Sequence, residues 1–318
     1  MFSDLTAERC AFITQSLKTS IRHFGLALNP AAPLAAVVKD IEWMASFSAG
    51  PMSIGGAKDV DISRMVRALP RVEQAERIAI MLERVRGVPG ADVVVLCLKE
   101  NIDRLSTLHE RAQDLLFELE VGGRLAASGF PVSFAEPDIR LDFPTVSIGL
   151  PCKRPRSARR IVVSVREAVA QIQRAKLSVG VVVVSIEPIV HPPAPTGGLS
   201  GKKPAPKNWV ASTVEEADTG ARTMVREAVE PLLPKINGLF AKHSELAGVL
   251  FCGAFTALLN LPRAYAYRWL NFSVSSPRDT RLTELLGAFV QSNGAKALRK
   301  RSFHLASEAG AHPRPPVR

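Results

Sequence analysis

The segment that most constrains the fold is the run at 179–186, VGVVVVSI, which is apolar at nearly every position. A strand with one face in water alternates apolar and polar residues, whereas a strand covered on both faces is apolar almost throughout. The run therefore predicts a central strand, in a sheet whose two faces are both covered by other elements.

The elements predicted around this strand follow a definite order. Apolar positions repeat with helical spacing over 103–128, and three short, partly alternating runs follow at 131–134, 139–143 and 146–150, separated by turns that contain proline. A basic helix is expected at 157–176, just before the central strand. This order, which is helix, strand, strand, strand, helix and strand, predicts an α/β core with a mixed sheet.

Further helices and strands are predicted outside this core. The segment at 91–99 fits either a buried strand or a helix. The segments at 249–255 and 265–272 are interpreted as two more strands, which flank the sheet or pair with each other. The remaining apolar periodicity predicts helices at 5–28, 32–47, 70–86 and, interrupted near Pro231 and Pro234, at 212–241.

These elements divide the chain into three parts. We expect an N-terminal helical region over 1–100 and an α/β domain over 101–290. Within that domain, the segment at 187–208 is rich in proline, glycine and lysine and is interpreted as an exposed loop. The segment at 291–318 is basic and ends in proline-rich sequence, which predicts a mobile basic tail.

Charge and cysteine content restrict the partners and the compartment. The formal net charge is +11 and the pI is near 9.9, which predicts a polyanionic partner, either nucleic acid or an anionic membrane. The four cysteines are far apart and lack CxxC spacing, so we expect a reducing cytoplasm and neither a zinc site nor a disulfide framework.

No membrane segment is expected. The N-terminus carries acidic residues early and has no basic region followed by an apolar run, so it does not resemble a signal peptide. The longest uncharged apolar stretch, at 246–261, is shorter than the roughly 18 residues of a membrane-spanning helix and is interpreted as buried core. We therefore expect a cytoplasmic protein with no membrane partner.

The residues that could carry chemistry concentrate at 117–155. This stretch places a carboxylate on a helix, an aspartate at the end of a strand and a lysine close to the end of a neighbouring strand. Magnesium prefers hard oxygen ligands and keeps several of its waters, so one or two carboxylates and a backbone carbonyl are enough to bind it. The stretch therefore contains the parts needed to hold Mg²⁺ against a phosphodiester.

The sequences PD at 137–138 and PCK at 151–153, taken with the order of the elements, give the chain a family resemblance. In these features it resembles the PD-(D/E)xK, or restriction-endonuclease-like, nuclease superfamily over roughly residues 103–190. The resemblance implies a restriction-endonuclease-like mixed sheet flanked by helices. It also implies metal-dependent hydrolysis of phosphodiesters in DNA.

The resemblance assigns roles to particular residues. It implies that Glu118, Asp138 and Lys153 are catalytic, with Glu120 as the alternative helix carboxylate. It implies that Glu118, Asp138 and the backbone carbonyl of Cys152 are ligands of Mg²⁺. Lys153 would hold the attacking water or stabilise the negative charge that develops on the phosphate.

One position departs from the family pattern. The residue two places before Lys153 is acidic in the family but is Pro151 here, and a proline side chain cannot bind a metal. A replacement carboxylate would have to come from elsewhere, and the nearest candidates in the sequence are Glu120, Glu136 and Asp142. Without a replacement, the chain would be catalytically weak or inert.

A basic run follows the lysine of the motif. Cations in the first turn of a helix oppose the helix dipole, which favours acidic residues there, so we expect another interaction to favour them. Phosphate groups of nucleic acid would provide that interaction, with binding that weakens as salt is added and does not depend on base sequence. The predicted nucleic-acid-binding residues are Arg154, Arg156, Arg159 and Arg160.

Three functions are consistent with these features. The leading hypothesis is a Mg²⁺-dependent, nuclease-like hydrolase whose partner is nucleic acid, namely DNA. The second is a binding module that keeps the nuclease fold and the basic surface but does not cleave. The third is a regulatory or scaffolding protein that uses its helical part to bind a protein partner.

Overall fold

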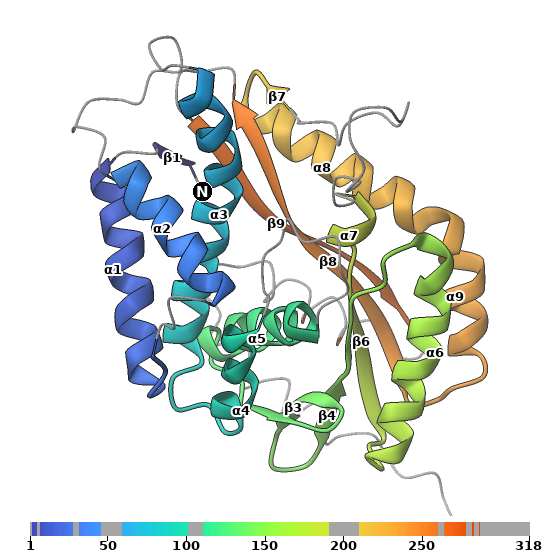
Figure 1. Ribbon diagram of the computed structural model, residues 1–318. Coiled ribbons are helices and arrows are strands. Elements are labelled where there is room, and N and C mark those ends of the chain that lie inside the picture. The colour runs from blue at the N-terminus through green and yellow to red at the C-terminus, as the bar shows by residue number, and fades with distance from the viewer. Residues whose placement is uncertain are drawn as a thin grey trace, which may run out of the picture.

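The computed structural model describes residues 2–4, 7–27, 32–45, 59–100, 111–190, 210–259, 264–277, 282 and 286. These residues form an α/β fold around an open mixed sheet (Figure 1). The predicted α/β core with a mixed sheet is therefore confirmed. The predicted tail at 291–318 and most of the predicted loop at 187–208 lie outside the described residues.

The sheet has the strand order β1-β9-β8-β6-β4-β3-β2. Strands β2, β3 and β4 form an antiparallel meander, β6 is parallel to both β4 and β8, and β9 returns antiparallel to β8. Two short strands lie off this path, since β5 pairs with β6 and β7 pairs with β8. The strands are β1 (Phe2–Asp4), β2 (Val132–Ala135), β3 (Asp138–Asp142), β4 (Ser147–Leu150), β5 (Cys152–Lys153), β6 (Val179–Ser185), β7 (Val210–Ala211), β8 (Leu246–Leu259) and β9 (Ala264–Ser275).

The helices occupy both faces of the sheet, with α1 to α5 on one side and α6, α8 and α9 on the other (Figure 1). The ambiguous segment at 91–99 is helical and forms α4 and η2. Helix α3 begins earlier than expected and runs through Pro70. The helices are α1 (Ala7–His23), α2 (Pro33–Ala45), α3 (Asp59–Arg84), α4 (Ala91–Val95), η2 (Leu96–Lys99), α5 (Arg111–Ala127), α6 (Ala158–Arg174), α7 (Glu187–Val190), α8 (Val214–Val229), η3 (Glu230–Leu232) and α9 (Leu233–Phe240).

Strand β6 is the centre of the sheet, as its sequence predicts. Its four consecutive valines at 181–184 are fully buried. Because successive side chains of a strand point to opposite faces, Val181 and Val183 join the hydrophobic core beneath α1 to α5, whereas Val182 and Val184 join the core beneath α6, α8 and α9. The all-valine run is therefore explained by two separate cores, one on each face.

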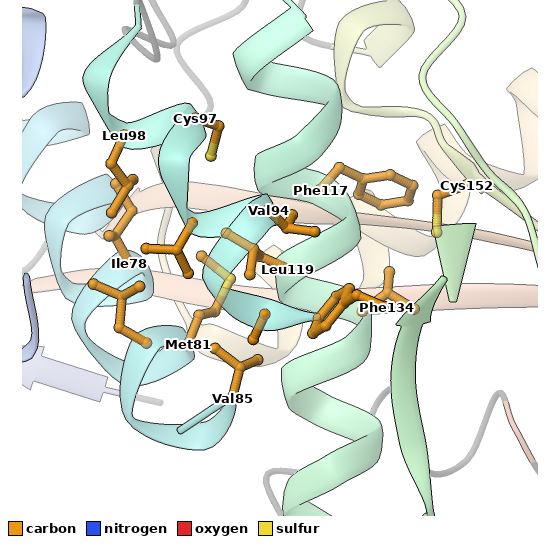
Figure 2. Close-up of a cluster of buried hydrophobic side chains, with 14 of the residues drawn as sticks. Ile78, Met81, Val85, Val94, Cys97, Leu98, Phe117, Leu119, Phe134 and Cys152 are labelled. Atoms are coloured by element: carbon orange, nitrogen blue, oxygen red, sulfur yellow. The ribbon is translucent and has the colours of Figure 1, made fainter. Parts of the chain in front are cut away.

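The N-terminal helices share the first of these cores with the sheet. Ile78 and Met81 of α3 pack in one cluster with Leu119 of α5 and Phe134 of β2 (Figure 2). On the other side of α5, Phe117 lies toward Cys152 of β5 in the same view. Helix α5 is thus held between the N-terminal helices and the strands that carry the candidate site.

The apolar stretch that begins at Leu246 is strand β8, not a helix, and its described side chains are buried. Burial over 246–254 confirms the interpretation of that part of the stretch as buried core, and the side chains of 255–261 lie outside the described residues. Across the ranges that the structure describes, none of the helices combines the length and the apolar character needed to cross a membrane.

The edge strand β2 is covered by the turn that precedes α4. The backbone N–H of Phe134 donates a hydrogen bond to the carbonyl of Pro89 at 2.8 Å. Gly90 has a φ of +79°, and a Cβ atom at this position would lie only 2.2 Å from the carbonyl oxygen of Phe134. Glycine is therefore required at 90 both for its backbone conformation and for the close approach of the strand.

We expect Gly90→Ala to destabilise the protein more than Gly87→Ala. Both glycines have a positive φ, which costs an alanine about 1 kcal/mol, but a Cβ at Gly87 would have nothing within 4 Å. The clash at Gly90 should add about 1–3 kcal/mol to the loss, because a packed backbone has to move. Denaturant unfolding of the two variants measures the difference, and equal losses of unfolding free energy would contradict this account of the edge strand.

Candidate functional site

The residues predicted from the motif come together at one place. Glu118 of α5, Asp138 of β3 and Lys153 of β5 all line a single cleft with a volume of about 610 Å³. The cleft lies at the carboxyl ends of β4 and β5, between α5 on one side and α6 on the other. Its other lining residues are Arg111, Asp114, Leu115, Cys152, Arg154, Pro155, Arg156, Arg160, Ser164 and Glu167.

Asp138 is held in place from several directions. The backbone N–H of Cys152 donates a hydrogen bond to its Oδ2 at 2.7 Å, and the ammonium of Lys153 lies 3.5 Å from the same oxygen. Nε2 of Gln171, on α6, is 3.5 Å from Oδ1. Asp138 also has a φ of +106°, a strained conformation for a residue with a side chain, and such strain persists where the surroundings fix the residue.

Glu118 is a carboxyl group that resists ionisation. Burial raises its pKa to about 8, and the negative charges of Asp138 and Asp114 add to the effect, against the opposing charges of Lys153 and Arg111. Burial also raises the pKa of Asp138, while Lys153 and the Cys152 N–H lower it. Two partly buried carboxyl groups thus share one cleft, and a cation bound between them would relieve the cost of ionising both.

The backbone at Cys152 could contribute a third oxygen. The carbonyl of the preceding residue, Pro151, accepts a hydrogen bond from Val183 N–H and therefore points toward β6. In an extended strand the N–H and C=O of one residue point to the same side, so those of Cys152 point away from β6, toward Asp138. The thiol itself is buried, which raises its pKa well above the ordinary value and keeps the sulfur protonated.

These donors fit Mg²⁺ only if water completes the coordination. Two carboxylates and one carbonyl are within the range that this ion accepts from a protein, because it keeps several of its waters. Within the described ranges, no group of three or more His, Cys, Asp or Glu side chains is arranged to hold a metal ion. The departure at Pro151 therefore leaves the site with fewer close ligands than the motif would supply.

None of the three carboxylates suggested as replacements is among the described residues that line the cleft. Glu120 is two residues from Glu118 on the same helix and therefore points to a different side, where Arg77 and Arg124 bind it. Glu136 is 59% exposed and lies 3.9 Å from Arg174. Asp142 is at the far end of β3, bonded to Ser133 and Ser147.

Two other carboxylates line the cleft instead. Asp114 precedes Glu118 by one turn of α5, and Glu167 lies on α6. The i, i+4 spacing of Asp114 and Glu118 is visible in the sequence and places both on one face of the helix. No comparable signal marks Glu167, because its position depends on how α6 crosses the sheet.

The four arginines predicted to bind nucleic acid do not all lie in the cleft. Arg154, Arg156 and Arg160 line the cleft, whereas Arg159 is exposed and is not among its described lining residues. Arg154 is turned inward and donates a hydrogen bond to Oε1 of Gln113 at 2.8 Å. Arg111, at the start of α5, also lines the cleft and is a cation that the sequence analysis did not predict there.

Comparisons of the chain with protein-family models, with curated proteins and with solved structures find no match. What the cleft does is therefore inferred from its residues.

We expect the stability of the protein to fall as the pH rises from about 5 to 8. The pKa of Glu118 is 4.5 without burial and about 8 in the folded chain, so between these values the folded state binds more protons than the unfolded state. The stabilising contribution is complete below pH 4.5 and is lost as the pH rises through 8, with a size on the order of 5 kcal/mol because one pKa unit corresponds to about 1.4 kcal/mol.

Denaturant unfolding at several pH values measures this effect in the wild type and in Glu118→Gln, which cannot ionise. The variant should lose much of the pH dependence, and Glu167→Gln, at a more exposed position in the same cleft, serves as the control. Parallel profiles for the wild type and Glu118→Gln would show that Glu118 does not titrate in this range.

Proposed function

We propose that the chain is a divergent nuclease of the PD-(D/E)xK type that hydrolyses phosphodiesters in DNA with the help of Mg²⁺. The observation that carries the proposal is that Glu118, Asp138 and Lys153 line one cleft, with the Lys153 ammonium 3.5 Å from Asp138. The order α5, β2, β3, β4, α6 and β6 supports a restriction-endonuclease-like core.

Each residue of the cleft would have one role in the hydrolysis. Asp138, Glu118 and the carbonyl of Cys152 would hold Mg²⁺, which when bound lowers the pKa of a water and stabilises charge on phosphate oxygens. Lys153 would orient the attacking water or donate to the phosphate oxygen as charge develops, an effect of about 3 kcal/mol for a well-aimed donor. Glu118 has to lose its proton before it can bind a cation, so activity should rise with pH.

The carboxylate that the motif lacks at Pro151 would come from Asp114 or Glu167. Asp114 is close enough to Glu118 to raise the pKa of that group. Glu167 is 55% exposed and lies 3.6 Å from Arg160, an ion pair that solvent weakens, so its side chain can turn toward the centre of the cleft. Because a metal needs only an oxygen at the right point in space, either residue could complete the site.

Plasmid nicking in Mg²⁺ or Mn²⁺ tests the proposal. The wild type should nick, and Asp138→Ala and Lys153→Ala should each reduce the rate about 100-fold or more, because each removes a group that acts on the developing charge. Asp142→Ala is the matched control, since it removes an aspartate from the other end of the same strand and should leave the rate unchanged. Equal nicking by all four proteins would mean that another site or a contaminant cleaves.

The second candidate function is a binding module with no activity, and Pro151 is the observation that favours it. In that case the wild type would not nick in either metal. It would still bind duplex DNA in EDTA, with an affinity that falls steeply with salt as arginine and lysine displace counterions. Binding that is insensitive to salt, together with no nicking, would exclude both nucleic-acid functions.

A further inference from the structure

Helix α6 presents a polar face to the cleft. Arg160, Ser164 and Glu167 follow one another at helical spacing and all line it. Ser164 is the most buried of the three, with only 7% of its surface exposed. Its hydroxyl oxygen is not among the fully enclosed polar atoms that lack a partner in the described chain, so it keeps access to the cleft.

The hydroxyl of Ser164 makes no hydrogen bond to any residue that the structure describes. Other hydroxyls on helices of this chain do, since Ser128 donates to the carbonyl of Arg124 at 2.9 Å and Thr223 to that of Thr219 at 3.0 Å. Ser164 could bond to its own helix in the same way but does not. Its hydroxyl is therefore free to meet a ligand in the cleft.

The surroundings of Ser164 favour an anion. Arg160 lies one turn before it, and Arg156 and Arg111 contribute two further cations to the walls of the cleft. The first turn of α6 contains no acidic residue, and Ser157 at its N-cap makes no side-chain capping bond within the described chain. The positive end of the helix dipole is thus directed at the same region. The described residues that line the cleft include five cations and four carboxyl groups, and of these carboxyl groups Glu167 forms an ion pair with Arg160 at 3.6 Å.

We propose that Ser164, Arg160 and Arg156 form a phosphate-binding subsite that is separate from the centre at Asp138. Arginine donates from a planar fork and serine from a single hydroxyl, and a phosphate has enough acceptor oxygens for both. Ser164 and Gln171, which contacts Asp138, are seven positions apart on α6, so their backbones are about 10 Å apart along the helix. One phosphate cannot occupy both sites.

The assignment of this phosphate to a DNA substrate rests on the proposed function, whereas the anion site itself does not. The subsite would bind a phosphate other than the one that is cleaved. That phosphate is either an internal phosphodiester of the strand or a terminal phosphomonoester, and the two sources share the chemistry that the subsite recognises.

Calorimetric titration of the full chain with inorganic phosphate tests the subsite without DNA or metal. Ionic strength is held constant with chloride, so that screening does not imitate binding. The wild type should bind one phosphate saturably, and Ser164→Ala and Arg160→Gln should each weaken binding about tenfold, because each removes one donor to an anion. Ser164→Thr keeps the hydroxyl and should bind as the wild type does.

Arg166→Gln is the matched control, since it removes the same charge from an exposed position on α6 that is not among the described cleft residues. It should bind phosphate as the wild type does. Alanine has a higher helix propensity than serine, so Ser164→Ala should fold normally, which the unfolding midpoint checks. No saturable binding by the wild type, or unchanged binding by Ser164→Ala and Arg160→Gln, would overturn the subsite.

Binding of 5′-phosphorylated and 5′-hydroxyl oligonucleotides in EDTA distinguishes the two sources. If the wild type binds the phosphorylated form more tightly and Ser164→Ala removes this difference, the subsite binds a terminal phosphate. Equal binding of the two forms, weakened by Ser164→Ala in both, assigns it to an internal phosphate. If phosphate binds at Ser164 but the wild type does not nick plasmid in any metal, the subsite stands and the proposed function fails.

Discussion

The burial of β6 on both faces is the constraint on which the rest of the fold depends. Four valines in succession can be covered only if alternate side chains enter two different cores. One core is closed by α1 to α5 and the other by α6, α8 and α9. A sheet of this kind has no face left for a site, so chemistry has to be placed at the ends of its strands, where α/β folds generally bind ligands.

That placement explains why the site draws on elements from both layers. Strand β5 ends at Lys153, beside the start of β3 at Asp138, because β3 runs antiparallel to β4. Helix α5 brings Glu118 from one face of the sheet and α6 brings Gln171 and Ser164 from the other. Burial between the two helices has a chemical consequence, since it raises the pKa of the carboxyl groups, and a bound cation would offset the cost of ionising them.

The sequence predicted those parts of the structure that depend on local pattern. Hydrophobic periodicity located α5, α6 and the strands, and the motif located Asp138 and Lys153. It could not predict features that depend on contacts between distant segments. Asp114 could have been predicted from its i, i+4 spacing to Glu118. Glu167 and Ser164 could not, because they reach the cleft only where α6 crosses the end of β5. The direction of Glu120, toward Arg77 and away from the cleft, likewise depends on a helix far away in the chain.

The central proposal is that Glu118 and Asp138 would share one metal ion in this cleft, and proton release on Mg²⁺ binding tests it most directly. Because the pKa of Glu118 is about 8, its carboxyl is mostly protonated at pH 7 and must lose that proton to become a ligand. Calorimetry at pH 7 in two buffers of different ionisation enthalpy should show about one proton released per Mg²⁺ bound by the wild type, and none by Glu118→Gln. Absence of Mg²⁺ binding, or binding without proton release by the wild type, would contradict the account.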